Sequence, residues 1–166
     1  QSYGMVLWDR VFQSVAAEYK DIETESLLVD AAAMNFVRRP ESFDVVVASN
    51  LFGDILSDLS AIITGSIGLA PSANLDPSRR FPSMFEPVHG SAPDIAGRGI
   101  ANPAGAIWSA SLMLEHLGEI DAAEAVLAAL EDVCREGPRT RDVGGAATTR
   151  EVGEAVAARV ATGRSR

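Results

Sequence analysis

The sequence has only one cysteine, few basic residues and no long apolar run. Cys134 cannot form an intrachain disulfide, which is typical of a reducing compartment such as the cytoplasm. The 14 basic residues are outnumbered by 23 acidic ones, and the formal charge of −9 disfavours nucleic acid and anionic membranes as partners. The longest uncharged stretches, such as residues 59–75, contain glycine, proline and serine and do not resemble membrane spans. No basic region followed by an apolar core begins the chain, so no signal peptide is predicted.

Helical and strand patterns alternate in the first 64 residues. Apolar residues spaced by three and four from Trp8 to Tyr19 predict an amphipathic helix. Two apolar runs predict strands, Leu27–Val29 and Phe43–Ala48, and the second has the composition of a strand buried on both faces. Helices are predicted after them, over Ala31–Arg38 and Gly53–Ile63. This alternation predicts an α/β fold with a parallel or mixed sheet covered by helices.

Glycine and proline dominate the next part of the chain, residues 64–103. Long regular elements are therefore not expected, and short strands are predicted around Ile67–Ala70 and Ser83–Phe85. A loop region of this length inside a compact domain is usually functional. Thr148 and Glu151 have the spacing of a capping box. Three further helices are predicted, over Ala104–Leu117, over Ile120–Glu136, and from the capping box to about Val160.

Two aspartates stand one helical turn apart, directly after the apolar run at residues 43–48. On a helix, Asp54 and Asp58 project from the same face, where two carboxylates repel each other. A divalent cation removes this repulsion, because hard cations bind carboxylate oxygens. Ligands of open α/β sheets also gather at the carboxyl ends of strands. From the spacing alone, however, a solvated acidic face of an amphipathic helix is the simpler interpretation.

Three longer strings occur in order along the chain. They are NLFGDILSD at residues 50–58, TGSIGLAPSANL at 64–75 and MFEPVHGSAPDIAGRGIANP at 84–103. Together they closely resemble the metal- and NAD-dependent decarboxylating dehydrogenases of 2-hydroxy acids, the family of isocitrate, 3-isopropylmalate, tartrate and D-malate dehydrogenases. The resemblance extends from about Tyr3 to about Val160.

The resemblance implies an isopropylmalate-dehydrogenase-like fold of two α/β domains, of which this chain is a C-terminal fragment. Residues 1–64 would belong to the inner domain, which forms the homodimer and binds the metal. Residues 65–166 would complete the outer domain, which binds the cofactor. The implied location is the cytoplasm.

The resemblance also implies a Mg2+ or Mn2+ site made by three aspartates. Asp54 and Asp58 match the pair on the helix, and Asp30 matches a third ligand that reaches the site of the neighbouring subunit. The ion would bind the substrate hydroxyl and a carboxylate oxygen and act as a Lewis acid. Without the family, Asp30 could equally be the N-cap of a helix that begins at Ala31.

The loop after the second short strand would receive the adenosine side of NAD. His89 and the three residues after it would surround adenine and its ribose, and Asp94 would accept a hydrogen bond from the ribose 2′-hydroxyl. A carboxylate there repels a 2′-phosphate and favours NAD over NADP. Read without the family, His89 could be structural and Asp94 could cap a short helical turn.

Three residues outside the segment 89–94 complete the implied cofactor site. Asn102 would bind the adenine edge, Glu86 would lie towards the nicotinamide, and Asp142 matches a further motif near the cofactor. The predicted cofactor-binding residues are thus Glu86, His89, Gly90, Ser91, Ala92, Asp94, Asn102 and Asp142.

No catalytic residue is predicted in this chain. By resemblance, the general base is a lysine and the acid a tyrosine, and both are expected upstream of Gln1, so the chain alone is predicted to be inactive. The loop at residues 71–84 resembles the tartrate and D-malate dehydrogenase branch, which acts on small 2-hydroxy dicarboxylates. Two alternatives stay open, a 3-isopropylmalate dehydrogenase and a non-catalytic fragment that only dimerises or binds NAD or metal.

Overall fold

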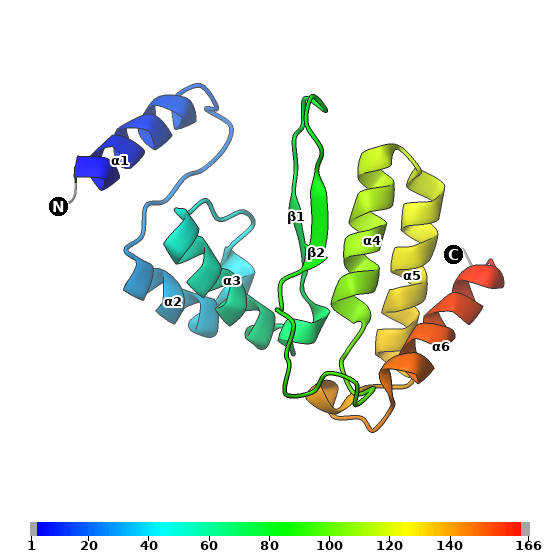
Figure 1. Cartoon of the computed structure of the whole chain (residues 1–166). Helices are drawn as coiled ribbons and strands as arrows, with labels where there is room; N and C mark the ends of the chain where they lie inside the picture. Colours follow the sequence, from blue (N-terminus) through cyan, green and yellow to red (C-terminus); the bar gives the residue numbers. More distant parts are fainter. Residues whose placement is uncertain (1–2, 164–166) are drawn as a thin grey trace.

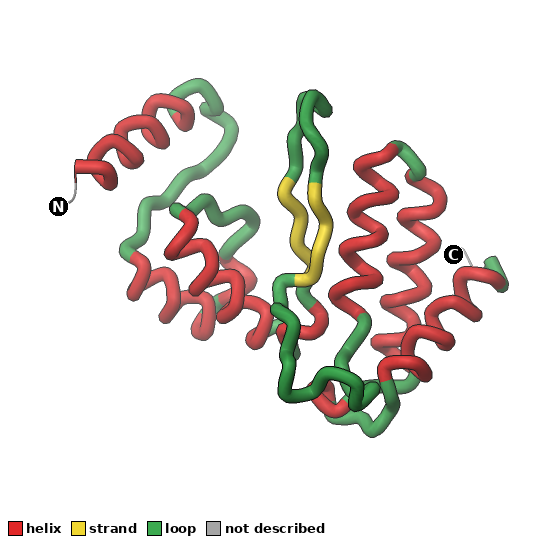
Figure 2. The backbone as a smooth tube through the Cα atoms, viewed as in Figure 1, coloured by secondary structure: helices red, strands yellow, loops and turns green. Residues whose placement is uncertain are grey.

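The computed structural model describes residues 3–163, so residues 1–2 and 164–166 of the two predicted domains lie outside it. The described part is mostly helical, with one small sheet (Figures 1 and 2). The α-helices are α1 Tyr3–Ala16, α2 Val29–Arg38, α3 Asn50–Ile63, α4 Ala104–Leu117, α5 Ile120–Glu136 and α6 Thr149–Ala161. The strands are β1 Pro71–Asn74 and β2 Met84–Pro87, and the 3-10 turns are η1 Pro40–Ser42, η2 Ile67–Leu69 and η3 Arg141–Val143.

Helices α2 and α3 pack together around a small apolar cluster. Ala32 and Phe36 of α2 meet Leu56 of α3 there. Phe43 joins the cluster from the connecting segment, with its ring centroid 4.6 Å from that of Phe36. Helix α1 stands apart from this pair (Figure 1), and the structure buries none of its residues. Its apolar stripe has the predicted spacing, but the helix ends at Ala16 and does not reach Tyr19 as predicted, and Trp8 is 40% exposed.

The two strands predicted in this part are wrong. Residues 27–28 and 43–48 are extended or irregular and pair with no strand among the described residues, and Val29 already begins α2. A strand needs a neighbour for its N–H and C=O groups. Val45 is 89% exposed, so the apolar run is not buried on either face by residues 3–163. Helix α3 does follow the run as predicted, but it begins at Asn50 instead of Gly53.

A second apolar cluster lies among the three C-terminal helices. Helix α4 packs on α5, and α5 packs on α6, around residues such as Leu130, Val133 and Val152. The bounds of α4 and α5 agree with the prediction. The capping box is also confirmed, since the Thr148 hydroxyl accepts from the Glu151 N–H while the Glu151 carboxylate accepts from the Thr148 N–H.

The only sheet in the described part of the chain is the antiparallel pair β1 and β2, in place of a parallel or mixed sheet. Pro71 lies opposite Pro87, and Asn74 lies opposite Met84. The first of the two strands begins later than predicted, because residues 67–69 form η2, which begins with the Ser66 hydroxyl accepting from the Gly68 N–H. The hairpin lies along α4 (Figure 1). No helix among residues 3–163 is long and apolar enough to cross a membrane.

Candidate functional site

The two aspartates of α3 lie on an exposed face of the helix. Asp54 and Asp58 are one turn apart, and Asn50 donates a long hydrogen bond of 3.4 Å to Asp54 Oδ2. Neither carboxylate pairs with a basic side chain within the described residues. Their oxygens therefore remain available, and they are the donor type that Mg2+ and Mn2+ prefer.

Asp30 lies in the first turn of α2. Its Oδ1 accepts a hydrogen bond of 2.9 Å from the N–H of Ala31. The alternative that Asp30 is the N-cap is wrong, because the helix begins at Val29 and Leu28 occupies the N-cap position. A carboxylate in the first turn is still favourable to the helix dipole.

The structure does not bring the three aspartates together. Among residues 3–163, no three His, Cys, Asp or Glu side chains are close enough to hold a metal ion. The described chain thus offers two carboxylates on one helix face, and the remaining ligands of any ion there have to come from elsewhere. The predicted role of Asp30 at a neighbouring subunit stays a prediction.

The segment from Val88 to Ala101 leaves β2 as a series of turns. The Val88 N–H donates to the Ala70 carbonyl at 3.0 Å, which holds the start of the segment beside β1. The His89 ring lies 3.0 Å from the Gly90 carbonyl, so Nδ1–H donates there. Ala92 has a positive φ of 41°, and its carbonyl accepts from the Ile95 N–H.

Most of this segment is open to solvent. Glu86 and the four loop residues from Gly90 to Pro93 are exposed. Asp94 is exposed too, and its side chain takes part in no hydrogen bond within the described residues, so it does not cap a turn there. The structure therefore leaves main-chain groups and one free carboxylate on a single loop.

Asp142, on η3, joins three segments of the chain through its carboxylate. Its Oδ2 accepts from Ser66 Oγ and, at 2.9 Å, from Asn102 Nδ2. Its Oδ1 accepts from Thr140 Oγ1, a side chain that is only 1% exposed. Partial burial raises the pKa of Asp142, but the hydrogen bonds from Ser66, Thr140 and Asn102 outweigh it, so the pKa lies below its ordinary value.

The amide of Asn102 is fixed at both of its ends. Its Nδ2 donates to Asp142, and its Oδ1 accepts from the N–H of Ala104 at 3.0 Å, at the start of α4. Sequence reasoning missed Ser66 and Thr140 as members of this group. Ser66 lies 76 residues from Asp142 and leaves no local signal in the sequence, whereas Thr140 lies only two residues before Asp142, within reach of a local side-chain hydrogen bond.

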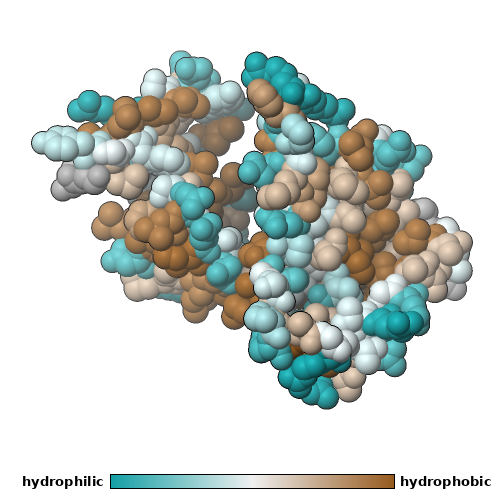
Figure 3. Space-filling model, in the orientation of Figure 1, coloured by the Kyte–Doolittle hydropathy of each residue, from teal (hydrophilic) through white to brown (hydrophobic). Residues whose placement is uncertain are grey.

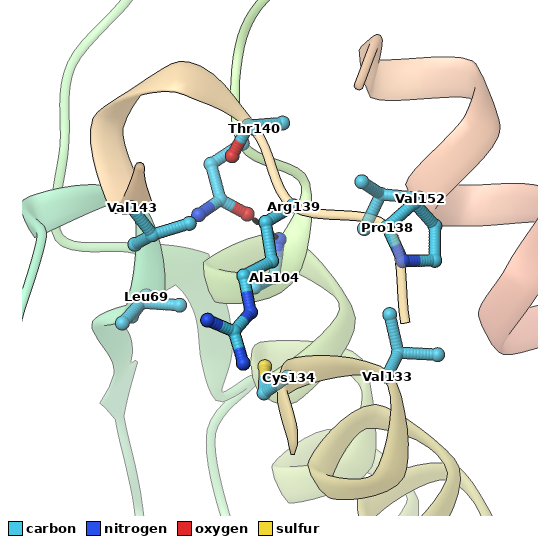
Figure 4. Close-up of a pocket in the computed structure, with 10 residues that line it drawn as sticks. Leu69, Ala104, Val133, Cys134, Pro138, Arg139, Thr140, Val143 and Val152 are labelled. Atoms are coloured by element: carbon cyan, nitrogen blue, oxygen red, sulfur yellow. Dashed lines mark hydrogen bonds between the residues drawn. The ribbon is translucent and has the colours of Figure 1, made fainter. Parts of the chain in front are cut away.

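A hollow of about 240 Å³ adjoins this group on the side of α5 (Figure 4). Cys134 and Arg139 lie on its wall with Val133 and Val143. Burial raises the pKa of the Cys134 thiol, although the charge of Arg139 lowers it. The thiol is therefore neutral at pH 7 and poorly suited to act as a nucleophile.

The comparisons with known proteins cover nearly the whole chain. The family model described as isocitrate/isopropylmalate dehydrogenase matches residues 2–156. A probable tartrate dehydrogenase/decarboxylase of Bacillus subtilis (strain 168) is 58% identical over 95% of this chain and 45% of its own length. D-malate dehydrogenase (decarboxylating) of Escherichia coli (strain K12) is 52% identical over 92% of this chain and 44% of its own length. The chain thus spans less than half of the curated relatives that it matches.

The fold has a close counterpart among solved structures. The crystal structure of isocitrate dehydrogenase from Methylococcus capsulatus superposes with a TM-score of 0.87 at 43% identity, over 93% of this chain and 45% of the other. This overlap confirms the predicted fold class, an α/β fold of the isopropylmalate dehydrogenase type.

Proposed function

Because the chain belongs to the isocitrate/isopropylmalate dehydrogenase family, we propose that it is the C-terminal part of an oxidative decarboxylase of a 2-hydroxy dicarboxylate. The observation that carries this proposal is the 58% identity to a relative named tartrate dehydrogenase/decarboxylase. The identity of 52% to D-malate dehydrogenase supports the same substrate branch. In this proposal the enzyme uses NAD and either Mg2+ or Mn2+.

The metal ligands in this proposal are Asp54 and Asp58, with Asp30 serving the site of a second subunit. The support is the exposed, unpaired state of the two α3 carboxylates within the described residues. A bound ion would supply Lewis acid chemistry at the hydroxyl and carboxylate oxygens of the substrate. The aspartates themselves would fix the ion at the carboxyl end of segment 43–48, beside the substrate.

The cofactor site in this proposal is the loop from Glu86 to Asp94 together with Asn102 and Asp142. Exposed main-chain groups at Gly90, Ser91 and Ala92 suit the adenosine, with His89 beside them. The free carboxylate of Asp94 suits a ribose 2′-hydroxyl and disfavours a 2′-phosphate, which supports NAD over NADP. One N–H and one lone pair of Asn102 remain for the adenine edge.

The domain division at residues 64 and 65 and the homodimer belong to the same proposal. The α2–α3 cluster and the α4–α5–α6 cluster share no residue and lie on either side of that boundary, which supports the division. Large apolar side chains of the first part are exposed, as the brown atoms in the left half of Figure 3 show. Leu51, Ile55 and Ile62 of α3 are among them. Such a surface is typical of an interface.

Calorimetric titration of Mn2+ into the purified chain tests the metal site. We expect saturable binding that Asp54→Asn and Asp58→Asn abolish. Glu124→Gln removes one charge from an exposed face of α5 and is the matched control, which should bind as the wild type does. Equal binding by all variants, or none by the wild type, would contradict a site formed by the α3 pair in this chain.

The substrate branch is tested by coupled assays with NAD, Mn2+ and either tartrate, D-malate or 3-isopropylmalate. The lysine and tyrosine of the proposed chemistry are not assigned in this chain, so we expect it to produce no NADH on its own. A longer protein that contains this chain should oxidise tartrate or D-malate faster than 3-isopropylmalate. Preference for 3-isopropylmalate would refute the proposed branch. Metal-dependent NADH formation by the 166-residue chain would refute its inactivity.

A further inference from the structure

The carboxylate of Asp142 accepts hydrogen bonds from three segments around the start of α4. Ser66 precedes η2, Asn102 precedes α4, and Thr140 precedes η3, and each donates a hydrogen bond to Asp142. Ser66 also accepts from the Gly68 N–H, and Asn102 also accepts from the Ala104 N–H. The Asp142 side chain thereby links distant parts of the sequence. Ser66, Asn102 and Asp142 are each separated from the next by 36 or more residues.

We propose that Asp142 serves the cofactor site as a positioning residue, which holds the Asn102 amide in one orientation for the adenine edge of the cofactor. This role replaces the direct contact with the cofactor that is predicted for Asp142 above. The proposal rests on the function proposed above in assigning Asn102 to adenine. It adds that the recognition depends on a carboxylate that the ligand does not touch.

The hydrogen-bond accounting of Asn102 leads to this role. An amide has two N–H donors and an oxygen with two lone pairs. Asp142 takes one N–H, and Ala104 takes one lone pair. One donor and one acceptor remain, and this is the combination with which an asparagine binds adenine. If the amide turned by half a rotation, its oxygen would meet the carboxylate and its NH2 would meet the Ala104 N–H, so both contacts oppose the flip.

The accounting of Asp142 gives the complementary result. Its two oxygens already accept three hydrogen bonds from side chains of the protein. Close packing also confines the group, because a Cβ at Gly68 would lie 2.8 Å from Asn102 Cβ and 3.1 Å from Asp142 Oδ2. Three of the roughly four acceptor sites of the carboxylate are therefore taken by the protein, whereas Asn102 keeps both a donor and an acceptor free.

Asp142→Leu separates positioning from packing, because it keeps roughly the shape of the side chain and removes both acceptor oxygens. Asp142→Asn would not do so, because its amide can keep its oxygen at the Oδ2 position for Ser66 and Asn102 and turn its NH2 to the Thr140 hydroxyl. Ser66→Ala is the matched control, since it removes one hydrogen bond to Asp142 and leaves that to Asn102 in place. Asp142→Leu and Ser66→Ala should both unfold at a lower temperature than the wild type.

The first measurement is the side-chain 15N–1H resonance of Asn102 in the NMR spectrum, assigned by its loss in Asn102→Ala. We expect it to shift strongly in Asp142→Leu and to stay close to its wild-type position in Ser66→Ala. This readout needs no ligand. An Asn102 resonance that is unchanged in Asp142→Leu would overturn the positioning role.

The second measurement is the Kd for NAD, by calorimetry, in a double-mutant cycle of Asp142→Leu and Asn102→Ala. We expect Asp142→Leu alone to weaken binding by about tenfold, the effect of one hydrogen bond. In the Asn102→Ala background it should weaken binding no further, because its effect passes through Asn102. Additive losses, or a normal Kd in Asp142→Leu, would overturn the proposal.

The two measurements distinguish a failure of the proposed cofactor site from a failure of the positioning role. If the wild-type chain binds no NAD, or if Asn102→Ala leaves the Kd unchanged, the proposed cofactor site is wrong for this chain. The NMR comparison then still decides whether Asp142 sets the orientation of Asn102.

Discussion

Gly105 provides a sharp test of how α4 is placed against the sheet. It is the second residue of α4 and is buried. A Cβ at this position would lie 2.9 Å from the Ala70 carbonyl oxygen, 3.0 Å from that of Gly68 and 3.3 Å from Pro87 Cβ. Both oxygens belong to the main chain, so Gly105→Ala can be accommodated only if α4 or the η2–β1 segment moves.

The expected cost follows from the balance of two effects. An alanine in an open helical position stabilises relative to glycine by about 0.5–1 kcal/mol. Overpacking against a fixed backbone costs about 1–3 kcal/mol. We therefore expect a net loss of stability in Gly105→Ala. A Cβ at Gly153, within α6, would meet no heavy atom within 4 Å beyond its own helical neighbours, so Gly153→Ala should stabilise the chain by about 0.5–1 kcal/mol.

Urea unfolding of the three proteins, followed by circular dichroism at 222 nm, measures both free energies. At this chain length, 1 kcal/mol corresponds to about 2–4 °C in Tm, so thermal melts should separate the variants as well. Opposite signs for the same chemical change would establish the close approach of α4 to η2 and β2. A Gly105→Ala variant as stable as Gly153→Ala would refute it.

Three further perturbations have defined outcomes. Thr148→Ala removes the hydroxyl of the capping box and should lower the free energy of unfolding by about 1 kcal/mol in urea melts, and no loss would contradict the cap. Because the pKa of Asp142 is lowered in the folded chain, its carboxylate stabilises the fold at pH values above the ordinary pKa of 3.8. The free energy of unfolding should therefore fall as the pH drops from 3.8 to the lowered pKa. An equally steep fall in Asp142→Asn would refute Asp142 as the source. Phe36→Ala should lower the free energy of unfolding by about 3 kcal/mol in the same melts. Its neighbour Val37 is 66% exposed, so Val37→Ala should change stability by less than about 0.5 kcal/mol. Equal effects would contradict the α2–α3 cluster.

Local patterns predicted the elements whose neighbours are also close in sequence. Helices α4 and α5 are joined by two residues and bury apolar faces against each other, so their periodicity and the glycine after each determine their bounds. The capping box of α6 involves residues three apart and was equally predictable. The Asp142 group was not, because Ser66, Asn102 and Asp142 meet only after the chain has folded.

The wrong strand prediction at residues 43–48 concerns a segment whose strand neighbours are not among the described residues. Apart from Asp44, the run at residues 43–48 is apolar on both of the faces that a strand would have, and such a pattern specifies two covering layers and two neighbouring strands. Residues 3–163 supply no neighbouring strand and cover only the Phe43 end of the run, so Val45, Val46 and Val47 are all exposed. The same holds for Leu51 and Ile55 on α3.

The exposed run at residues 43–48 lies next to the proposed metal site in the sequence. The run leads directly into α3, whose first turns carry Asp54 and Asp58, so whatever covers residues 43–48 also orients the start of that helix. The α4–α5–α6 part, by contrast, buries its apolar residues among its own helices and ties its cofactor-side polar group together internally. The groups of the proposed adenosine site are therefore positioned within this chain, whereas the segment that leads into the proposed metal site is left largely uncovered by residues 3–163. This asymmetry explains why the Asn102 group can be tested in the isolated chain, and why binding of Mn2+ is the more demanding result to obtain from it.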